Sequence, residues 1–285
     1  MNYRLLADPL SFDSRQKNPI PFITFSLFVW FHPLILLALT KYFLPNIWNR
    51  EIASGFFIII ATFLVCHFIF AFGEYFFHRY ILHIISIKNM RIFYRKHLRH
   101  HTLTPIYFDE INKKIDSAYS INNIDRDECG TFPPWALVAF LSGFSPLLFL
   151  MAYIFEDLPI LISGYGALSL SYYLYEVTHV RHHYSYDDWW QKKLQSPLLG
   201  KVWQVMYGFH QAHHVNYRCN MHVGGFLGLP IGDWLFATYK QPSKILADGV
   251  SATREMMQKL NPQPRWPISW LDQRALKRKT RILKN

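Results

Sequence analysis

Histidine is the residue type with the clearest chemical pattern in this chain of 285 residues. Eleven of the fourteen histidines fall into four short boxes, three of which have the form HxxHH. The boxes are HRYILH (His78, His83), HLRHH (His97, His100, His101), HVRHH (His179, His182, His183) and HQAHH (His210, His213, His214). At this histidine content, one HxxHH box is expected about 0.03 times by chance. Because imidazole is a common ligand of transition metals, the boxes predict a metal site.

The spacing within each box indicates how the imidazoles can meet a metal. On a helix, positions i, i+3 and i+4 share one face, so each HxxHH box presents three rings to the same side. His78 and His83 are five residues apart and lie about 140° apart on an α-helix, so this pair should span a helix end or serve two different metals. About ten imidazoles without a cysteine box indicate two ions, and imidazole suits iron, zinc, copper and nickel alike.

Three further histidines, His32, His67 and His222, lie outside the boxes. A lone histidine in a folded protein is most often a hydrogen-bonded core or interface residue. We therefore predict that these three side chains are structural and do not bind a metal.

Four apolar stretches of the chain are long enough to cross a bilayer, and none contains Asp, Glu, Lys or Arg. They are residues 20–40, 52–73, 133–155 and 158–175. Short connections join the first to the second and the third to the fourth, which predicts two helical hairpins. The fourth stretch is the shortest and contains Gly164 and Gly166, so a buried or re-entrant helix is the alternative for it. The sequence therefore predicts an all-α membrane protein with four transmembrane helices.

The basic residues indicate which side of the membrane holds the boxes. Segments 1–19, 78–132 and 176–285 carry three, nine and sixteen Lys or Arg, whereas the two short connections carry two and none. The positive-inside rule places the first three segments in the cytoplasm. Residues 1–285 are therefore expected to form one domain, in which the cytosolic parts 78–132 and 176–285 make a helical cap that carries the histidine boxes. The net charge of +11 fits a membrane surface, and no basic stripe typical of a nucleic-acid partner is found.

Several of these motifs together resemble the fatty acid hydroxylase / sterol desaturase superfamily of integral-membrane di-iron enzymes, and most of all its fatty acid 2-hydroxylase branch. The branch has EYxxHRxxxH, which EYFFHRYILH (74–83) matches, followed by HxxHH and by FPP at 132–134. Its YDxTHxxxH element is similar to YEVTHVRHH (175–183), with Glu176 in place of Asp, and GDWLFATY (232–239) is similar to a common ending. The resemblance covers roughly residues 55 to 240.

The resemblance implies a set of ten metal ligands in this chain. They are His78, His83, His97, His100, His101, His179, His183, His210, His213 and His214. In the superfamily such residues hold two metals, which are iron in the working enzyme and for which zinc may substitute in purified protein. His182 has no counterpart in the branch, so its role stays undecided. Glu74 and Glu176 each stand one turn before a ligand and can accept its imidazole N–H; an interfacial acid is the alternative for both.

The resemblance also implies an activity: an iron-dependent monooxygenase that hydroxylates a lipid acyl chain with O2. A desaturase or a sterol or carotenoid oxidase would share these boxes, and a metal-binding or transport protein is a more remote alternative. Only about 19 residues precede the first span, so the two electrons are expected from a separate redox protein. The site is expected on the cytoplasmic face of the bacterial inner membrane or the endoplasmic reticulum. Residues 102–132 exceed the usual link of the branch and are expected to form a loop-like lid or surface excursion.

Overall fold

The computed structural model describes residues 22–109, 114–117, 132–133, 135–184, 186–242 and 254–284. Their elements are α1 (Phe22–Phe43), α2 (Pro45–Ala53), α3 (Phe56–Phe77), the π-helix η2 (His78–Leu82), the 3-10 helix η3 (Lys88–Met90), α4 (Arg91–Leu103), β1 (Ile106–Asp109), β2 (Lys114–Ser117), α6 (Trp135–Ile154), α7 (Ile160–His182), the π-helix η4 (Tyr186–Trp190), α8 (Gln191–Leu194), α9 (Gly200–Val215), α10 (Ile231–Leu235), α11 (Arg254–Lys259) and α12 (Ile268–Lys284). The predicted helical character is confirmed. The exception among the described residues is the antiparallel hairpin of β1 and β2, which lies within the predicted surface excursion 102–132; residues 110–113 and 118–131 of that stretch lie outside the described residues.

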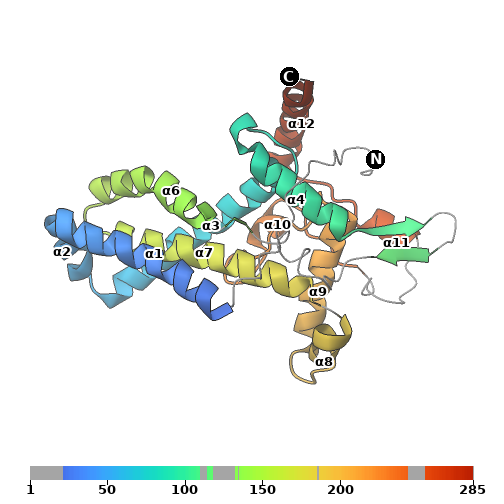
Figure 1. The fold of residues 1–285 in the computed structure, drawn as a ribbon, viewed down its shortest axis with the longest axis horizontal. Helices are drawn as coiled ribbons and strands as arrows, with labels where there is room; N and C mark the ends of the chain where they lie inside the picture. The colour runs from blue at the N-terminus through green and yellow to red at the C-terminus, as the bar shows by residue number, and fades with distance from the viewer. Residues whose placement is uncertain are drawn as a thin grey trace.

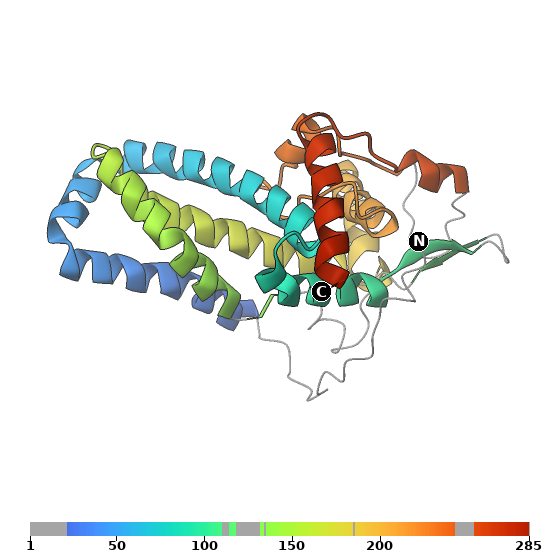
Figure 2. The ribbon, with the colours of Figure 1, turned by 90° about the horizontal axis from the view of Figure 1, so that it is seen from above.

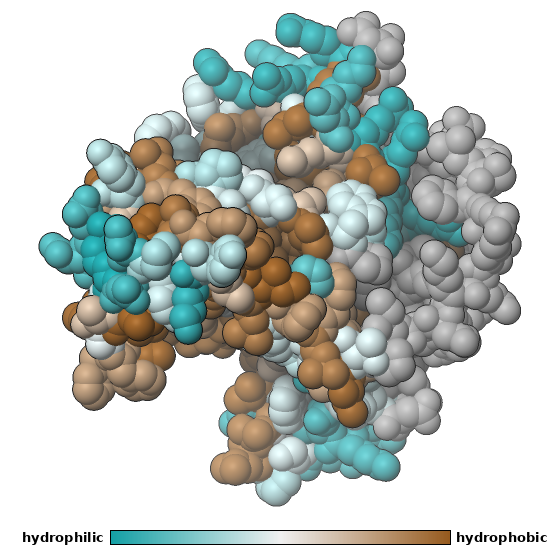
Figure 3. Space-filling view, turned by 60° about the vertical axis from the view of Figure 1, so that its left-hand side comes forward, coloured by the Kyte–Doolittle hydropathy of each residue, from teal (hydrophilic) through white to brown (hydrophobic). Residues whose placement is uncertain are grey.

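Four long helices, α1, α3, α6 and α7, run along the long axis of the molecule and form a bundle, while α4, α9, α10 and α12 gather at one end of it as a cap (Figures 1 and 2). Three helices are long and apolar enough to cross a membrane: Phe22–Phe43, Phe56–Leu82 and Trp135–Ile154. They correspond to the first three predicted spans. Figure 3 shows brown, hydrophobic side chains over the bundle and teal, hydrophilic ones at its α2 end.

The fourth predicted span, 158–175, corresponds to the first part of α7, which is long enough but is not among the helices that reach the apolarity of a span. The reason is its position. Helices α1, α3 and α6 all pack against α7, so that most of its residues are buried by protein. A helix shielded from lipid can carry serine and tyrosine at little cost. The structure therefore shows three membrane-crossing candidates, and α7 as a fourth span stays a prediction.

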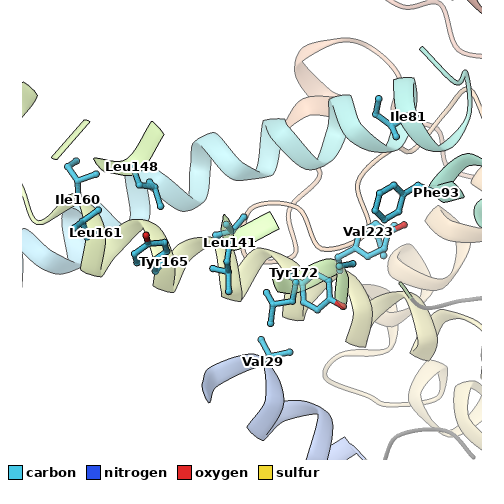
Figure 4. Packing of buried hydrophobic residues seen from close by; sticks show 14 of the residues in the cluster. Val29, Ile81, Phe93, Leu141, Leu148, Ile160, Leu161, Tyr165, Tyr172 and Val223 are labelled. Carbon is cyan, nitrogen blue, oxygen red and sulfur yellow. The ribbon is translucent and has the colours of Figure 1, made fainter. Parts of the chain in front are cut away.

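The core of the bundle lies between α6 and α7. Leu141, Leu148, Leu161 and Tyr165 are buried there in one continuous cluster, which extends to Val223 near the cap (Figure 4). Because α7 continues from this core to His182, the bundle fixes the direction in which its histidines enter the cap.

At the far end of the bundle, the short connection expected between the first two spans is occupied mainly by α2, which closes that end. The buried carboxylate of Glu51 accepts hydrogen bonds from the backbone N–H groups of Leu161 (2.7 Å) and Ile162 (2.8 Å). These are free N–H groups of the first turn of α7, which has no cap of its own. Gly55, at φ +83°, provides the left-handed turn between α2 and α3.

Candidate metal centre

Nine of the eleven box histidines form two buried clusters in the cap. The five-histidine cluster consists of His100, His179, His183, His210 and His214, and the four-histidine cluster consists of His78, His83, His97 and His213. Within each cluster, the ligand nitrogens all lie within 4.8 Å of one another. Helices α4 and α9 contribute to both clusters, whereas α7 serves the first and η2 the second. The structure therefore brings histidines from all four boxes together in groups that could hold a metal ion, which supports the predicted metal site.

The turn of chain that carries His78 and His83 explains how two residues five apart share one cluster. Residues His78–Leu82 form a π-helix, in which i→i+5 hydrogen bonds place residues five apart nearly above one another. The two Nε2 atoms are 3.2 Å apart. The prediction that this pair spans a helix end is confirmed, because α3 ends here. The alternative that the two rings belong to different sites is wrong, because the 140° offset applies only to an α-helix.

The nitrogens of the four-histidine cluster are spaced like ligands of one ion. The Nε2 atom of His83 lies 3.2, 3.1 and 3.1 Å from the Nε2 atoms of His78, His97 and His213, and those of His78 and His97 are 3.0 Å apart. Two nitrogens each about 2.05 Å from a metal, at angles of 90–109°, lie about 2.9 to 3.4 Å apart. The measured separations fall within this interval.

The protonation of the rings supports the same conclusion. The Nδ1 atoms of His78 and His213 face the carbonyl oxygens of Met221 and Cys219, the second at 2.8 Å. A carbonyl only accepts, so each Nδ1 carries the proton and each Nε2 presents a lone pair. Both lone pairs point toward Nε2 of His83, which in a neutral ring can donate to only one of them. A bound cation satisfies all of these nitrogens, and the residues present therefore fit a metal ion.

The five-histidine cluster is held by long helices. Its nitrogens approach closely at His210 and His183, whose Nε2 atoms are 3.0 Å apart. The Nδ1 of His214 donates to the carbonyl oxygen of Thr104 (2.9 Å), which leaves its Nε2 free of a proton. All five side chains are buried. The cluster again offers only imidazole, so it fits a transition metal and not a hard oxygen-seeking ion such as calcium.

His101 is the one residue of the ten-ligand set that belongs to neither cluster. Its Nε2 lies 3.1 Å from that of His97 in the four-histidine cluster, and its ring stacks on His214 of the other, with centroids 4.2 Å apart. The structure therefore places His101 between the two clusters.

His182 lies outside both clusters as well. Its ring stacks on His210, with centroids 4.7 Å apart, and is parallel to Trp190. Neither ring nitrogen has a hydrogen-bond partner among the described residues, and burial lowers its pKa to about 3. Of the HVRHH box, the structure thus brings His179 and His183 into a cluster and places His182, whose role the sequence left undecided, outside it.

Neither acid holds the neighbouring ligand as predicted. Glu74 accepts hydrogen bonds from the backbone N–H groups of residues 223–225, because the imidazole of His78 is already satisfied by a carbonyl. Glu176 accepts from the N–H of Phe132 at 2.9 Å, and its Oε2 is buried without a hydrogen-bond partner in the described part of the chain. Burial raises the pKa of Glu176 to about 8, so this acid is protonated at neutral pH.

The three lone histidines are structural, as predicted. His32 bonds a backbone carbonyl of its own helix, and His67 bonds Ser171 and the N–H of Leu227. The ring of His222 lies between the carboxylate of Asp233 (3.1 Å) and a backbone carbonyl of α3 (3.0 Å). Both partners are hydrogen-bond acceptors, so both ring nitrogens are occupied and are not available to a metal. In spite of burial, the hydrogen bond and charge of Asp233 raise the pKa of His222.

Two positioning groups were not predicted from the sequence. Asp233 accepts from the N–H groups of Met221 and His222, both at 2.9 Å, and so fixes the carbonyl that holds His78. Arg79, next to His78, makes a buried two-pronged ion pair with Asp272 of α12. For Asp233, only the motif GDWLFATY gave any signal in the sequence. The pair of Arg79 and Asp272 has no local pattern, because its residues are 193 positions apart.

A small cavity of about 70 Å³ lies beside the four-histidine cluster. It is lined by Arg79, His83, Ile84, Tyr217, Arg218, Asp272, Leu276 and Lys279. The ring of Tyr217 stacks on that of His83, with centroids 5.2 Å apart. His83 is only half-buried, whereas the other three members of its cluster are buried. This cluster therefore has a partly open side.

The surroundings keep the imidazoles neutral. Burial, and then the neighbouring rings, lower the pKa of His97, His100 and His101 well below the usual value, and burial lowers the pKa of His213 to about 4. At neutral pH these rings therefore offer lone pairs, as metal binding requires.

Comparisons with protein families, with curated proteins and with solved structures return no match for this chain. The argument about function therefore rests on the geometry of the site and on the sequence motifs.

Proposed function

We propose that this protein is a membrane di-iron oxygenase that hydroxylates a lipid acyl chain with O2 and two electrons from a separate redox protein. The observation that carries the proposal is the pair of adjacent, buried, all-imidazole clusters at the end of a bundle with three membrane-crossing candidates. Ring centroids of the two clusters approach to 5.7 Å between His210 and His213, so two ions would be near neighbours. The motif resemblance supplies the class of reaction.

The donor set favours redox-active metals over a structural zinc. Structural zinc sites are closed four-ligand sites rich in cysteine. Here one cluster has five imidazoles and the other four, and the only buried cysteine described, Cys219, serves the site through its backbone carbonyl. Two irons supply the electron transfer and O2 chemistry that an unreactive C–H bond requires.

The residues of this chain would do four things in such a reaction. The carbonyls of Met221 and Cys219 hold two imidazoles with Nε2 toward the metal. The burial of the five-histidine cluster excludes water from it, and burial favours the neutral rings in both clusters. Glu176 holds a proton close to the end of α7, on a carboxyl group whose Oε2 makes no hydrogen bond among the described residues. Arg79 and Asp272 fix the π-helix that carries the first box.

The overall reaction has a defined balance: R–H, O2, two electrons and two protons give R–OH and water. The electrons must enter from a donor protein, for which the cytoplasmic face is the proposed side, in the bacterial inner membrane or the endoplasmic reticulum. A lipid reaches the site from the membrane in which the three candidate helices lie.

The test is to express the protein with iron and a reducing system in cells grown under 18O2, and to profile the lipids by mass spectrometry. Hydroxylation predicts a lipid that gains one 18O atom and keeps its degree of unsaturation. Loss of two hydrogens without added oxygen would replace the proposal by a desaturase. The matched control is His97→Ala, which should give no product although the protein still inserts.

Metal flux into proteoliposomes without any lipid product would indicate transport instead. In the described bundle, the mid-span histidine His67 is already hydrogen-bonded, which disfavours a transport path.

A further inference from the structure

The segment between α9 and α10 does not stay in the cap. The backbone N–H of Leu227 donates to Nε2 of His67, at 3.1 Å. His67 lies near the middle of α3, ten residues and hence about 15 Å before its end at Phe77. The turn of residues 223–230 therefore runs from the cap down the side of a helix that is itself a candidate span.

Polar groups of α3 satisfy the backbone of this turn. The carboxylate of Glu74 accepts from the N–H groups of Val223 (2.6 Å), Gly224 (3.0 Å) and Gly225 (2.9 Å). Inside a bilayer no water can satisfy such groups, and irregular backbone is stable there only when protein does so. Two polar residues of this largely apolar helix, Glu74 and His67, therefore have a common role: both accept hydrogen bonds from the backbone of the turn.

The glycines of the turn allow this close packing. A Cβ atom at Gly224 would lie 2.7 Å from the backbone nitrogen of Tyr175 in α7, so any larger residue would push the turn away from the bundle. Gly225 has φ +54°, a left-handed conformation that other residues rarely adopt. The turn therefore fits between α3 and α7 only with these residues.

The outer side of the turn is apolar and unpartnered in the described structure. Leu227 and Leu229 are 53% and 48% exposed, and residues 223–232 contain no charged side chain. The ring of Phe226 packs edge-on against Phe68 of α3, which is itself 45% exposed. The apolar surface of the turn is thus continuous with the outer face of a membrane-crossing candidate.

We propose that residues 223–230 form a re-entrant turn that enters the hydrocarbon layer, with Leu227 and Leu229 in contact with lipid acyl chains. The residues that directly precede this turn supply two backbone carbonyls to the site: that of Cys219 holds His213, and that of Met221 holds His78. The turn therefore joins the acyl-chain region directly to the four-histidine cluster. This inference depends on membrane insertion and not on the proposed reaction.

The test is photo-crosslinking in lipid nanodiscs that contain the full chain. The photoreactive residue p-benzoylphenylalanine replaces Leu227, and in separate variants Ile69 or Lys259. Ile69 is 59% exposed on α3 and serves as the lipid-facing reference. Lys259 is a 72% exposed side chain on α11, remote from the bundle, and serves as the aqueous reference (Figure 1). All three side chains are exposed, so the replacements should leave the fold intact.

The expected result is a yield of lipid adduct at Leu227 within about twofold of that at Ile69 and at least tenfold above that at Lys259, by mass spectrometry. Leu229 is a second position in case the first replacement disturbs the turn, and the same yield is expected there. Adduct yields at Leu227 and Leu229 equal to that at Lys259 would overturn the proposal. So would crosslinks to a second copy of the chain in place of lipid.

Discussion

The two histidine clusters draw on the same two helices, α4 and α9, but they are completed in different ways. The five-histidine cluster is completed by α7, a long helix buried in the bundle, and all its members are buried. The four-histidine cluster is completed by one π-helical turn and by carbonyls of the loop after α9, and its His83 borders a cavity. The difference teaches that the bundle fixes one histidine cluster, whereas single contacts within the cap fix the other.

Deletion of one ligand from each cluster should give the largest contrast. His97→Ala leaves three imidazoles in its cluster, and we expect loss of that metal and a fall in lipid oxidation of about 1,000-fold or more. His183→Ala leaves four imidazoles, so most of the metal should remain and the activity should fall by about tenfold. Metal content is measured by plasma mass spectrometry. Equal metal loss from both variants would contradict the difference between the clusters.

The next largest effect is expected from Asp272→Asn. It leaves Arg79 buried without its counter-ion, which costs about 3–5 kcal/mol of unfolding free energy in comparable buried pairs. The metal of the four-histidine cluster should be lost preferentially, because Arg79 lies in the π-helix of that cluster. Thermal unfolding and metal content are measured together. The control is Glu255→Gln, which removes an exposed ion pair with Lys259 and should change neither quantity; equal depletion of both metals would show that α12 supports the whole cap.

A chelator should remove the metals of the two clusters at different rates. The open side at His83 gives solvent access to the four-histidine cluster, so its metal should leave first, about tenfold faster than the other. Tyr217→Ala removes the ring stacked on His83 and should accelerate the first phase only. A single phase for both metals in a time course of metal release would show that the cavity gives no access.

Acidification should lower the free energy of unfolding of the metal-free protein. The folded-state pKa of His213 is lowered to about 4, and that of His182 to about 3, so the unfolded chain binds more protons between about pH 6.5 and these values. The free energy of unfolding should therefore fall as the pH decreases through that window and become level below it. Urea unfolding at several pH values measures this. A free energy of unfolding that rises on acidification would contradict the conclusion that these rings are neutral in the folded protein.

The smallest effect is expected for His182→Ala. The ring packs on His210 and Trp190 and lies outside both clusters, so both metals should be retained and the activity should fall less than about fivefold. His179→Ala is the matched variant: like His183→Ala it leaves four imidazoles in its cluster, and the activity should fall by about tenfold. A fall in the activity of His182→Ala as large as that of His179→Ala would restore the view that all three rings of HVRHH are ligands.

The local part of this architecture could be predicted from the sequence. The i, i+3, i+4 spacing of HLRHH and HQAHH correctly indicated rings on one face, and three of the four apolar runs correspond to membrane-crossing candidates. Spacing does not determine which ring points to which cluster, however. His97 and His100 belong to different clusters although they are one turn apart.

The remaining features depend on contacts between distant parts of the chain. A π-helix at His78–Leu82 has no simple sequence signal, so the expected α-helical offset was wrong. Glu74 stands one turn before His78, yet it binds the backbone of residues 223–225, because a partner about 150 residues away competes for it. Sequence position therefore identified the acid as important but not what it holds.

The ion pair between Arg79 and Asp272 has a consequence for the order of events during synthesis. Its two partners are separated by 193 residues, and the members of the four-histidine cluster already span from His78 to His213. The ribosome synthesises the first box long before α12. Arg79 in the π-helix therefore has no buried counter-ion until Asp272 of α12 has emerged. The π-helix can therefore make its observed contacts only after α12 has been translated, which is late in the synthesis of the chain.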